Sequence, residues 1–411
     1  MPMKLQHIDI HSAITALSCA LDLVGVDEVR HGKRVALIAR AIAQHLNWSE
    51  LESLSILYSG MLHDCGVSRI HEHRRLTEML EWDGAEDHCI RGADYLSACP
   101  PLAHLSAEIR YHHTRWEKLL DLAVDHRIRL RANLLFLSDR IDVLQAPFLN
   151  TGQILTEYPA IIARIKTLSG VLFAPELVDA FAEIANVEAF WLAMEPEYLD
   201  EDLRRIGSHI PATLLDIPAL KELARLFSRV VDAKSPYTDE HSQRVAHIAR
   251  QLAVDFGIGG YELEQVEIAG LLHDIGKLRV SEDIIDKPGS LTVEERATMH
   301  RHSYDTFRIL QRVFEGSKIP VWAGFHHETL LGDGYPFKTE KKELDLECRI
   351  IAVADIFQAL AQQRPYRQTM SLEYILNDLQ SRVAAGRLDA EVVAKLINNA
   401  DLYYRLAVSS E

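Results

Sequence analysis

Residues 270–278 read GLLHDIGKL, in which His273, Asp274 and Lys277 interrupt an apolar and glycine-containing segment. Helical spacing predicts that Lys277 lies one turn beyond His273, on the same side of a helix. A polar side chain that is buried without a partner would cost about 2 kcal/mol or more. The stretch therefore predicts that other polar groups, or a bound ion, meet His273 and Asp274 inside the protein.

The same pattern occurs earlier in the chain at a nearly constant separation. GMLHDCG (60–66) precedes GLLHDIG (270–276) by 210 residues, and HGKRVALIARAIAQHL (31–46) precedes HSQRVAHIARQLAVDF (241–256) by the same 210. The later polar positions continue in step, with offsets of 214 to 216 residues. The matched positions are His31, His63, Asp64, His88, His112, His113 and Asp139 in the first half, and His241, His273, Asp274, His302, His326, His327 and Asp355 in the second. Seven matches in one order indicate a duplicated domain.

Hydrophobic periodicity predicts an all-α fold. In residues 241–256, Val245, Ile248, Leu252 and Phe256 recur at helical spacing on the same face as His241, and no segment shows sustained alternation of period two. A charged stretch with proline and glycine at 196–217 marks a boundary. We therefore predict one domain at 1–200, a linker at 201–214 and a second domain at 215–411.

Composition narrows the class of protein. The 411 residues are 48% hydrophobic and 25% charged, as in ordinary globular proteins, and no run approaches the roughly 18 apolar residues that span a bilayer. The formal net charge of −16 argues against binding to nucleic-acid duplexes or membrane surfaces, which need a positive field. Five scattered cysteines without a CxxC pair predict a reducing compartment, and hence a cytoplasmic protein.

Five inward histidines and two aspartates in the second half predict a metal centre. A single inward histidine is usually a satisfied core residue, but imidazoles and carboxylates together are natural ligands of divalent metals. Seven ligands suit two ions, with the two oxygens of Asp274 bridging them. We assign His241, His273, Asp274 and Asp355 to one ion, and Asp274, His302, His326 and His327 to the other. Two ions about 3.5–4 Å apart can activate a shared water and clamp the oxygens of an in-line phosphoryl displacement.

Several motifs of the second half closely resemble the HD-GYP family, a branch of the HD phosphohydrolase superfamily. They are HDIGK (273–277), HRHS (300–303), HHE (326–328), GDGYP (332–336) and VADIFQAL…RPYR (353–367). The resemblance implies two tandem HD-type helical domains. It also implies a metal-dependent phosphodiesterase that opens cyclic di-GMP to linear pGpG in bacterial signalling, in some members continuing to GMP. Two divalent ions, iron or manganese, are the family expectation, although the mixed ligands alone would also admit zinc, cobalt or nickel.

The resemblance also implies roles for individual residues. Asp274 and Lys277 are the catalytic pair, with Lys277 stabilising the charge that develops on the phosphoryl group. Arginine suits nucleotide contacts because its guanidinium forms bidentate hydrogen bonds to phosphate or guanine. The implied substrate-binding residues are Lys277, Gly334, Tyr335, Pro336, Arg364 and Arg367. A solvated lysine, a plain turn and surface arginines are the alternative interpretations of these positions.

Three departures from the family pattern bear on the prediction. TLL at 329–331 stands where the family often has Arg-Trp-Asp, so the loop after the metal histidines can hold substrate differently. Gln358 replaces a common aspartate, which would loosen the orientation of Arg364. Members with a third metal carry a glutamate where this chain has Tyr237, and we therefore predict a two-metal site.

The first domain resembles the same fold without its substrate apparatus. Val67 replaces the lysine, Thr114 replaces the glutamate of HHE, and Phe148 and Thr151 stand at the positions of the two arginines. We predict no catalysis there, although its seven matched histidines and aspartates could still hold metal. Its functional interpretation is a regulatory module, or a dimerising module that pairs two copies of the chain. The alternative is an inherited scaffold.

The leading hypothesis is thus a cyclic di-GMP phosphodiesterase whose chemistry is confined to the second domain. One alternative is an enzyme that prefers the mixed 3′,3′-cyclic GMP-AMP, because the 329–331 loop is altered. Another is a non-catalytic cyclic-dinucleotide receptor. The complete ligand set together with Lys277 favours an enzyme, since a receptor would not need all of these residues.

Overall fold

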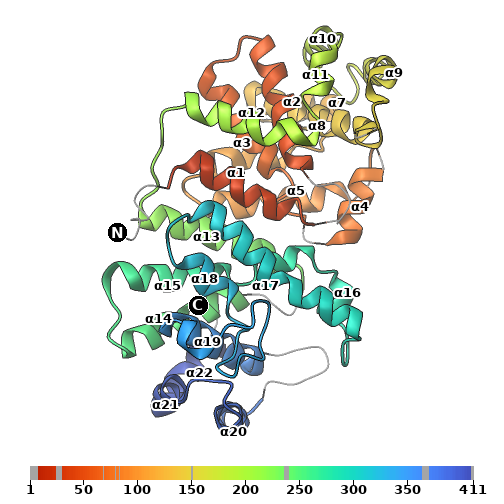
Figure 1. Ribbon diagram of the computed structural model, residues 1–411. Coiled ribbons are helices and arrows are strands. Elements are labelled where there is room, and N and C mark those ends of the chain that lie inside the picture. Colours follow the sequence, from red (N-terminus) through yellow and green to blue (C-terminus); the bar gives the residue numbers. More distant parts are fainter. Residues whose placement is uncertain are drawn as a thin grey trace. The chain divides into compact units, whose positions relative to one another are not determined.

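The fold is all-α, as predicted (Figure 1). The computed structural model describes residues 8–24, 30–67, 69–78, 80–82, 84–149, 151–235, 240–362 and 370–408. Within these ranges the chain forms α-helices and short 3-10 helices, and the only bridges of β type are two isolated ones, Asp9 with Leu214 and Ser169 with Phe173.

The chain divides into two compact units, which we call the N-terminal unit (9–214) and the C-terminal unit (215–411 together with Ile8). The helices of the N-terminal unit are α1 (Ile10–Leu21), α2 (His31–His45), α3 (Glu50–Leu62), α4 (Ile70–Glu78), α5 (Ala85–Ser97), η2 (Ala103–Leu105), α6 (Ser106–Arg110), α7 (Trp116–Asp121), α8 (His126–Gln145), η3 (Ala146–Phe148), α9 (Ile154–Lys166), α10 (Pro175–Ile184), α11 (Glu188–Leu192) and α12 (Pro196–His209).

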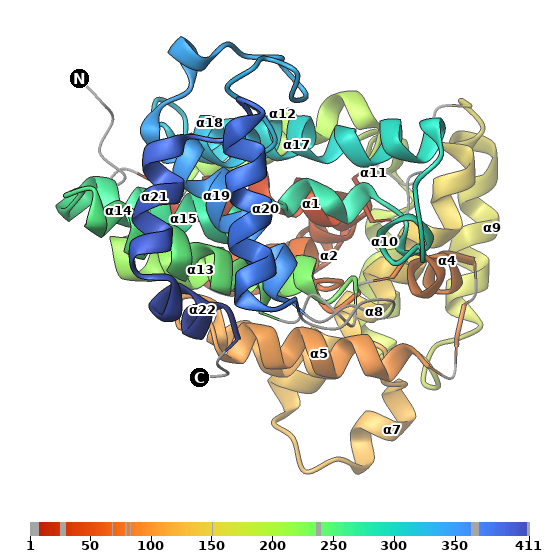
Figure 2. The ribbon, with the colours of Figure 1, turned by 90° about the horizontal axis from the view of Figure 1, so that it is seen from below.

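The C-terminal unit repeats the same succession of long helices. Its elements are α13 (Ile217–Asp232), α14 (His241–Asp255), α15 (Gly260–Leu272), η4 (Ile275–Arg279), α16 (Glu282–Ile285), α17 (Val293–Val313), α18 (Ile319–Gly324), η5 (Lys341–Glu343), α19 (Leu346–Ala361), α20 (Leu372–Ala384), α21 (Ala390–Asn398) and α22 (Ala400–Val408). In Figure 2, α19, α20 and α21 lie side by side, in agreement with their packing.

The predicted linker at 201–214 differs from the structure, because α12 extends through its first part to His209. The reason is an amphipathic pattern, in which Leu199 and Leu203 are fully buried in the N-terminal unit. The chain then runs beside the start of α1, where the backbone N–H of Ile10 donates to the carbonyl of Thr213. This stretch is therefore part of the N-terminal unit and not a connector.

The core helices of the two units have matching buried faces. In α14, Val245, Ile248 and Leu252 are fully buried, and the corresponding apolar positions of α2 are buried too. Phe256 follows the end of α14 and is only half-buried, so the predicted apolar face ends at Leu252. α14 packs against α15 and α19, just as α2 packs against α3 and α8. This packing brings one end of α14 next to the chain that follows α15.

Two glycines of the opening stretch allow close backbone contacts. A Cβ on Gly270 would lie only 2.8 Å from the Cα of Ala246, so glycine lets α15 approach α14. A Cβ on Gly276 would collide with the carbonyl oxygen of His302 on α17. The same two contacts recur in the N-terminal unit at Gly60 and Gly66. The glycines of the motif therefore position the helices that carry its polar residues.

Gly276→Ala is expected to lower the free energy of unfolding of the C-terminal unit by about 1–3 kcal/mol, because the new methyl group overpacks a closed backbone contact. Urea denaturation of the full chain would measure the loss. Gly259→Ala is the matched control, since a Cβ there would meet no atom within 4 Å. Equal stability of the two variants would contradict the packing role of Gly276.

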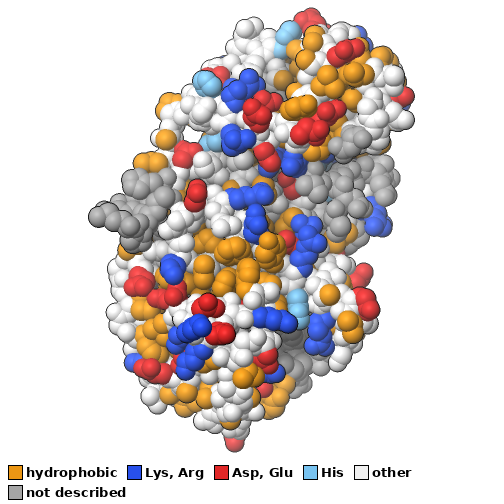
Figure 3. All heavy atoms as spheres, in the orientation of Figure 1, with side chains coloured by type: hydrophobic (Ala, Val, Ile, Leu, Met, Phe, Trp, Pro, Cys, Tyr) orange, Lys and Arg blue, Asp and Glu red, His pale blue; other side chains and the backbone are white. Residues whose placement is uncertain are grey.

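The surface carries both signs of charge. On the face shown in Figure 3, acidic and basic side chains are interspersed. Among the described residues, every helix is too short or too polar to cross a membrane.

Candidate metal centre

The structure brings the seven predicted ligands of the C-terminal unit together from separate elements. His241 begins α14, His273 caps the end of α15 and Asp274 follows it. The remaining four residues come from α17, from the turn after α18 and from α19: His302, His326, His327 and Asp355. All seven are buried except His327, which is half-buried. Their role as ligands stays a prediction, but their convergence is a property of the fold.

Asp274 lies at the centre of this cluster, with each carboxylate oxygen facing a different group. Its Oδ2 is 3.3 Å from Nε2 of His273 and 3.8 Å from Nε2 of His241. Its Oδ1 is 3.4 Å from Nε2 of His302 and 3.7 Å from Nε2 of His326. This arrangement agrees with the predicted bridge between two ions.

The donor atoms also have the spacing that metal ligands need. His241, His273 and Asp355 form one group, and His302, His326 and His327 form another, with the donor atoms of each group within 4.8 Å of one another. Ligands of one ion lie about 3 to 3.4 Å apart, because metal–ligand bonds are about 2.0–2.2 Å long. The Nε2 of His241 is 3.4 Å from Oδ1 of Asp355, and the Nε2 atoms of His302 and His326 are 3.3 Å apart.

Backbone carbonyls fix the orientation of three imidazoles. Nδ1 of His273 donates to the carbonyl of Gly270 at 2.7 Å, and Nδ1 of His326 donates to that of Ala323 at 2.6 Å. His302 makes the same contact with Met299. When such a ring is neutral, its lone pair is on Nε2, which is the atom that faces the cluster. Three ligands are therefore oriented before any ion binds.

Burial sets the protonation of the cluster. It lowers the pKa of His302 to about 3 and that of His327 to about 4, so both rings are neutral and able to bind metal at neutral pH. Burial also lowers the pKa of His273, but the carboxylates of Asp274 and Asp355 outweigh it and raise this pKa to about 10. Without an ion, the proton on His273 thus balances part of the buried negative charge.

Two buried polar atoms at the centre make no hydrogen bond within the described part of the chain, namely Nε2 of His273 and Oδ1 of Asp274. Buried polar atoms without a hydrogen bond are rare in folded proteins, and a bound ion would satisfy both of these atoms. Together with the donor set and its spacing, they show that the residues present fit divalent metal.

Lys277 contacts the centre by a different route from the one predicted. α15 ends at Leu272, and Lys277 lies on the 3-10 helix η4, so it does not continue the helix beyond His273. The close approach of Gly276 to α17 turns the chain at this point. Nζ of Lys277 nevertheless donates to Oδ2 of Asp274, and 25% of the lysine side chain is exposed. The ammonium group therefore lies between the cluster and solvent.

The GYP turn is held against the cluster by Glu328. The carboxylate of Glu328 accepts hydrogen bonds from the backbone N–H groups of the three residues that follow the turn, Phe337, Lys338 and Thr339, at 2.7 to 3.2 Å. Gly334 is buried against the backbone, since a Cβ there would lie 2.6 Å from the Cα of Glu328. Pro336 follows a cis peptide bond. The glutamate of HHE and the GYP turn are thus one structural unit.

Tyr335 lies between two histidines. Its ring stacks on His300 with centroids 3.7 Å apart, and it lies 4.8 Å from the ring of the predicted ligand His327. The tyrosine therefore borders the cluster, and its position depends on the turn that Glu328 anchors.

Glu328→Ala is expected to lower kcat/KM for cyclic-dinucleotide hydrolysis by about 10–100-fold, because the turn that carries Tyr335 loses three hydrogen bonds. Metal content should stay at the parent level, which plasma emission spectrometry would measure beside the kinetics. Glu328→Gln, which keeps one acceptor oxygen, should fall between the two. A parent-like rate for the alanine variant would refute the anchoring role.

A cavity of about 320 Å³ opens beside the cluster and includes two arginines that the motifs did not indicate. Arg382 pairs with Asp378 at 2.6 Å, and Arg387 pairs with Asp333 at 2.8 Å. The cavity is lined by His326, His327, Glu328, Thr329, Ala352, Asp355, Ile356, Ala359, Leu360, Arg382, Arg387 and Leu388. Both arginines lie beyond the last recognised motif, and no sequence signal pointed to them.

The altered loop at 329–331 has its own internal support. Oγ1 of Thr329 donates to Asp333 at 2.6 Å, and the N–H of Leu330 donates to the carbonyl of Arg387. Leu331 is 61% exposed. The loop at the edge of the cavity is therefore ordered by Thr329 and Arg387.

Gln358 bears on a predicted metal ligand, while its predicted effect on Arg364 concerns a residue outside the described part of the chain. It is fully buried, and neither atom of its amide, nor Nδ1 of His241, makes a hydrogen bond in the described part of the chain. In the N-terminal unit, Asp142 occupies the matching position and accepts from Nδ1 of His31 at 2.7 Å. The departure thus removes the support of a predicted ligand. Tyr237, Arg364 and Arg367 lie outside the described residues.

The N-terminal unit brings its seven matched residues together in the same way. Asp64 lies 3.4 Å from His63 and 3.4 Å from His88, and Asp139 lies 3.4 Å from His31 and 3.6 Å from His113. His112 completes the set, 3.2 Å from His88. Val67, Thr114, Phe148 and Thr151 provide no lysine, glutamate or arginine at the substrate positions.

Comparisons with known proteins agree with the duplicated architecture. Two HD domain families match the chain, one at residues 29–144 and the other at 225–392. The "3'3'-cGAMP-specific phosphodiesterase 1" of Vibrio cholerae is 39% identical over 411 residues, which cover 98% of this chain and 94% of the relative. A "Cyclic di-GMP phosphodiesterase" of Thermotoga maritima is 32% identical over 168 residues, which cover 39% of this chain and 45% of the relative.

A solved structure has the same tandem architecture. The crystal structure of a cyclic GMP-AMP specific phosphodiesterase of V. cholerae (V-cGAP3) superposes with a TM-score of 0.64 at 26% identity, covering 96% of this chain and 98% of that one. These similarities extend over both units and confirm the family that the motifs indicate. The chain therefore belongs to the HD-GYP family of the HD phosphohydrolase superfamily and carries two HD domains in tandem.

Proposed function

We propose that the C-terminal unit is a metal-dependent phosphodiesterase for cyclic dinucleotides and that 3′,3′-cyclic GMP-AMP is its preferred substrate. The observation that supports this most directly is the convergence of five imidazoles and two carboxylates on Asp274, whose two oxygens face separate donor groups. Such a set suits two divalent ions, for which iron or manganese remains the family expectation.

The reaction suits the residues around the cluster. When bound, a pair of divalent ions would supply Lewis acidity to the phosphoryl oxygens and lower the pKa of a water molecule. Hydrolysis forms a bond from the water oxygen to phosphorus and breaks the bond to a ribose 3′-oxygen, which takes up a proton. Lys277, half-buried beside Asp274, can donate to a phosphoryl oxygen as charge develops. Tyr335 and the cavity at Arg382 and Arg387 can hold the nucleotide.

The preference for the mixed substrate replaces cyclic di-GMP, our first expectation. The relative that is similar over 98% of this chain is named for 3'3'-cGAMP, whereas the cyclic di-GMP relative from T. maritima matches 39% of it. The 329–331 loop, which departs from the common family pattern, lines the edge of the cavity through Thr329. Cyclic di-GMP remains the second candidate, because the metal ligands and Lys277 do not distinguish the bases.

A competition assay tests the proposal. The purified full chain, loaded with Fe²⁺ or Mn²⁺, would receive equal concentrations of 3′,3′-cyclic GMP-AMP and cyclic di-GMP, and chromatography would follow both linear products. Faster loss of the mixed substrate is the expected result. Faster loss of cyclic di-GMP would support the second candidate. Tight binding of either without turnover in any metal would support the receptor hypothesis instead.

A further inference from the structure

We propose that the N-terminal unit is a one-metal centre, in which Asp64, His88, His112 and His113 bind a single ion of zinc type with Cys89 at its edge. The guanidinium of Arg140, which binds Oδ2 of Asp139, supplies a positive charge at this cluster that disfavours a second ion. The proposal concerns metal number and type in the N-terminal unit, so it does not depend on the activity of the C-terminal unit.

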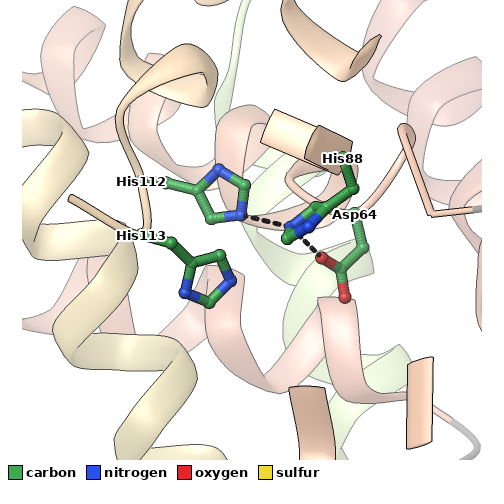
Figure 4. Close-up of side chains that lie close together, drawn as sticks. All are labelled: Asp64, His88, His112 and His113. Carbon is green, nitrogen blue, oxygen red and sulfur yellow. Dashed lines mark hydrogen bonds and ion pairs between the residues drawn. The ribbon is translucent and has the colours of Figure 1, made fainter. Parts of the chain in front are cut away.

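The four proposed ligands point at one another (Figure 4). Their donor atoms lie within 4.8 Å of one another, and they come from the end of α3, from α5 and from the turn after α6. Nε2 of His88 is 3.2 Å from Nε2 of His112 and 3.4 Å from Oδ1 of Asp64. Tetrahedral ligands of zinc lie about 3.3 Å apart, since the Zn–N bond is about 2.0–2.1 Å long.

The surroundings of the cluster suit a resident ion. His88 and His112 are fully buried, and Nδ1 of His112 donates to the carbonyl of Ile109, which leaves its Nε2 lone pair facing His88. Oδ1 of Asp64 makes no hydrogen bond within the described residues, and an ion bound beside it would satisfy it. The four residues are of the kind that holds structural zinc, and Cys89 lies close enough to join them as a ligand.

Cys89 changes the kind of metal that this centre would take. Its Sγ lies 3.8 Å from Nε2 of His88 and 3.9 Å from Nε2 of His112. The C-terminal unit has Ser303 at the corresponding position, 3.3 Å from Nε2 of His302. Sulfur is a soft ligand and favours zinc or cobalt over manganese or magnesium. The two units thus differ in metal preference at one position.

The buried guanidinium of Arg140 disfavours a second ion in this unit. Its side chain is 2% exposed, and its Nη2 and Nε donate to Oδ2 of Asp139 at 2.6 and 3.1 Å. The matching residue of the C-terminal unit is Ile356, which leaves Asp355 free to group with His241 and His273. A guanidinium next to a divalent ion would repel it strongly when both are buried.

His31, His63 and Asp64 still lie close enough to share an ion. However, Asp139, the carboxylate that would complete this group, is held by Arg140. Arg140 binds Oδ2 of Asp139, while Oδ1 faces Nε2 of His31 at 3.4 Å, so the group has its four donors but a fixed positive charge is bound to one of them. We infer that it stays without metal.

Metal counting on the full chain tests the proposal. The His302→Ala/Asp355→Ala variant removes ligands of the C-terminal centre, and circular dichroism would verify its fold. After zinc loading and desalting, plasma emission spectrometry should find one ion per chain, and a further His112→Ala change should reduce this to none. Retention of no ion, or of two, by the first variant would overturn the proposal. Activity is not needed for this readout.

Cobalt spectroscopy tests the ligand at the edge. The same variant loaded with Co²⁺ should show a sulfur-to-cobalt charge-transfer band. Cys89→Ser should abolish this band. Cys99 is a buried cysteine elsewhere in the unit, so Cys99→Ser should leave the band unchanged. A band that survives Cys89→Ser would exclude Cys89. Arg140→Ile, which copies Ile356, should raise the zinc content from one ion to two, and an unchanged content would refute the role of Arg140. If that variant does not fold, the Cys89 pair still decides whether the thiol binds.

Discussion

Asp274→Asn is expected to reduce hydrolysis of cyclic dinucleotides by about 10³-fold or more, because the bridge between the two donor groups is lost. Asparagine has the same shape, so the helices around it should stay in place. One of its two positions, however, becomes an NH₂ group that cannot bind a cation. Metal content measured beside kcat/KM should fall together with the rate.

Asp64→Asn is the matched control that the duplication provides. Asp64 occupies the same place in the N-terminal cluster, 3.4 Å from both His63 and His88, but this unit has no lysine, HHE glutamate or GYP turn at the substrate positions. Its substitution should leave turnover within about twofold of the parent value, as for residues outside the reacting site. A parent-like rate for Asp274→Asn, or an equal loss in both variants, would contradict chemistry confined to the C-terminal unit.

The repeat explains why so much of the candidate site could be predicted from the sequence. The predicted ligands are histidines and aspartates at matching places in the two units, so duplication copied both their type and their spacing. The all-α fold followed from helical periodicity for a similar reason, since apolar residues such as Val245 and Leu252 mark the buried face.

The features that the sequence did not predict depend on contacts between distant segments. α15 ends at Leu272 because Gly276 must fit against α17, so the place of Lys277 could not be read from local spacing. Arg382 and Arg387 reach the cavity from a helix and a turn that carry no motif. No sequence motif marks Arg140 or Cys89. Their proposed roles follow from their buried contacts with Asp139 and His88.

The identity of the bases could not be predicted for a related reason. In the proposed function, the HD, HHE and Lys277 positions act on the phosphodiester, which cyclic di-GMP and cyclic GMP-AMP share. Discrimination between guanine and adenine needs a few hydrogen bonds to base edges, and these can come from any residue that lines the cavity. Family motifs therefore identify the reaction more reliably than the substrate.

Lys277→Met is expected to lower kcat by about 10²–10³-fold while metal content stays at the parent level. The ammonium group lies next to Asp274 and is 25% exposed, so it can reach a phosphoryl oxygen without being a ligand itself. Methionine keeps the length and apolar stem of the side chain but removes the charge and the donor. Single-turnover kinetics with metal-loaded protein would separate the chemical step from product release.

Two further variants distinguish a contact of Lys277 with the phosphoryl group from a general effect of lost positive charge. Lys287→Met removes a lysine of the same unit that pairs with Glu295 on the surface, and it should leave kcat unchanged within about twofold, as for a surface ion pair. Lys277→Arg keeps the charge but replaces the compact ammonium by a planar guanidinium, so it should recover only part of the rate. A contact of Lys277 with the phosphoryl group predicts a slow reaction in a protein that is fully loaded with metal. If Lys277→Met instead loses metal in proportion to activity, the lysine acts by supporting Asp274.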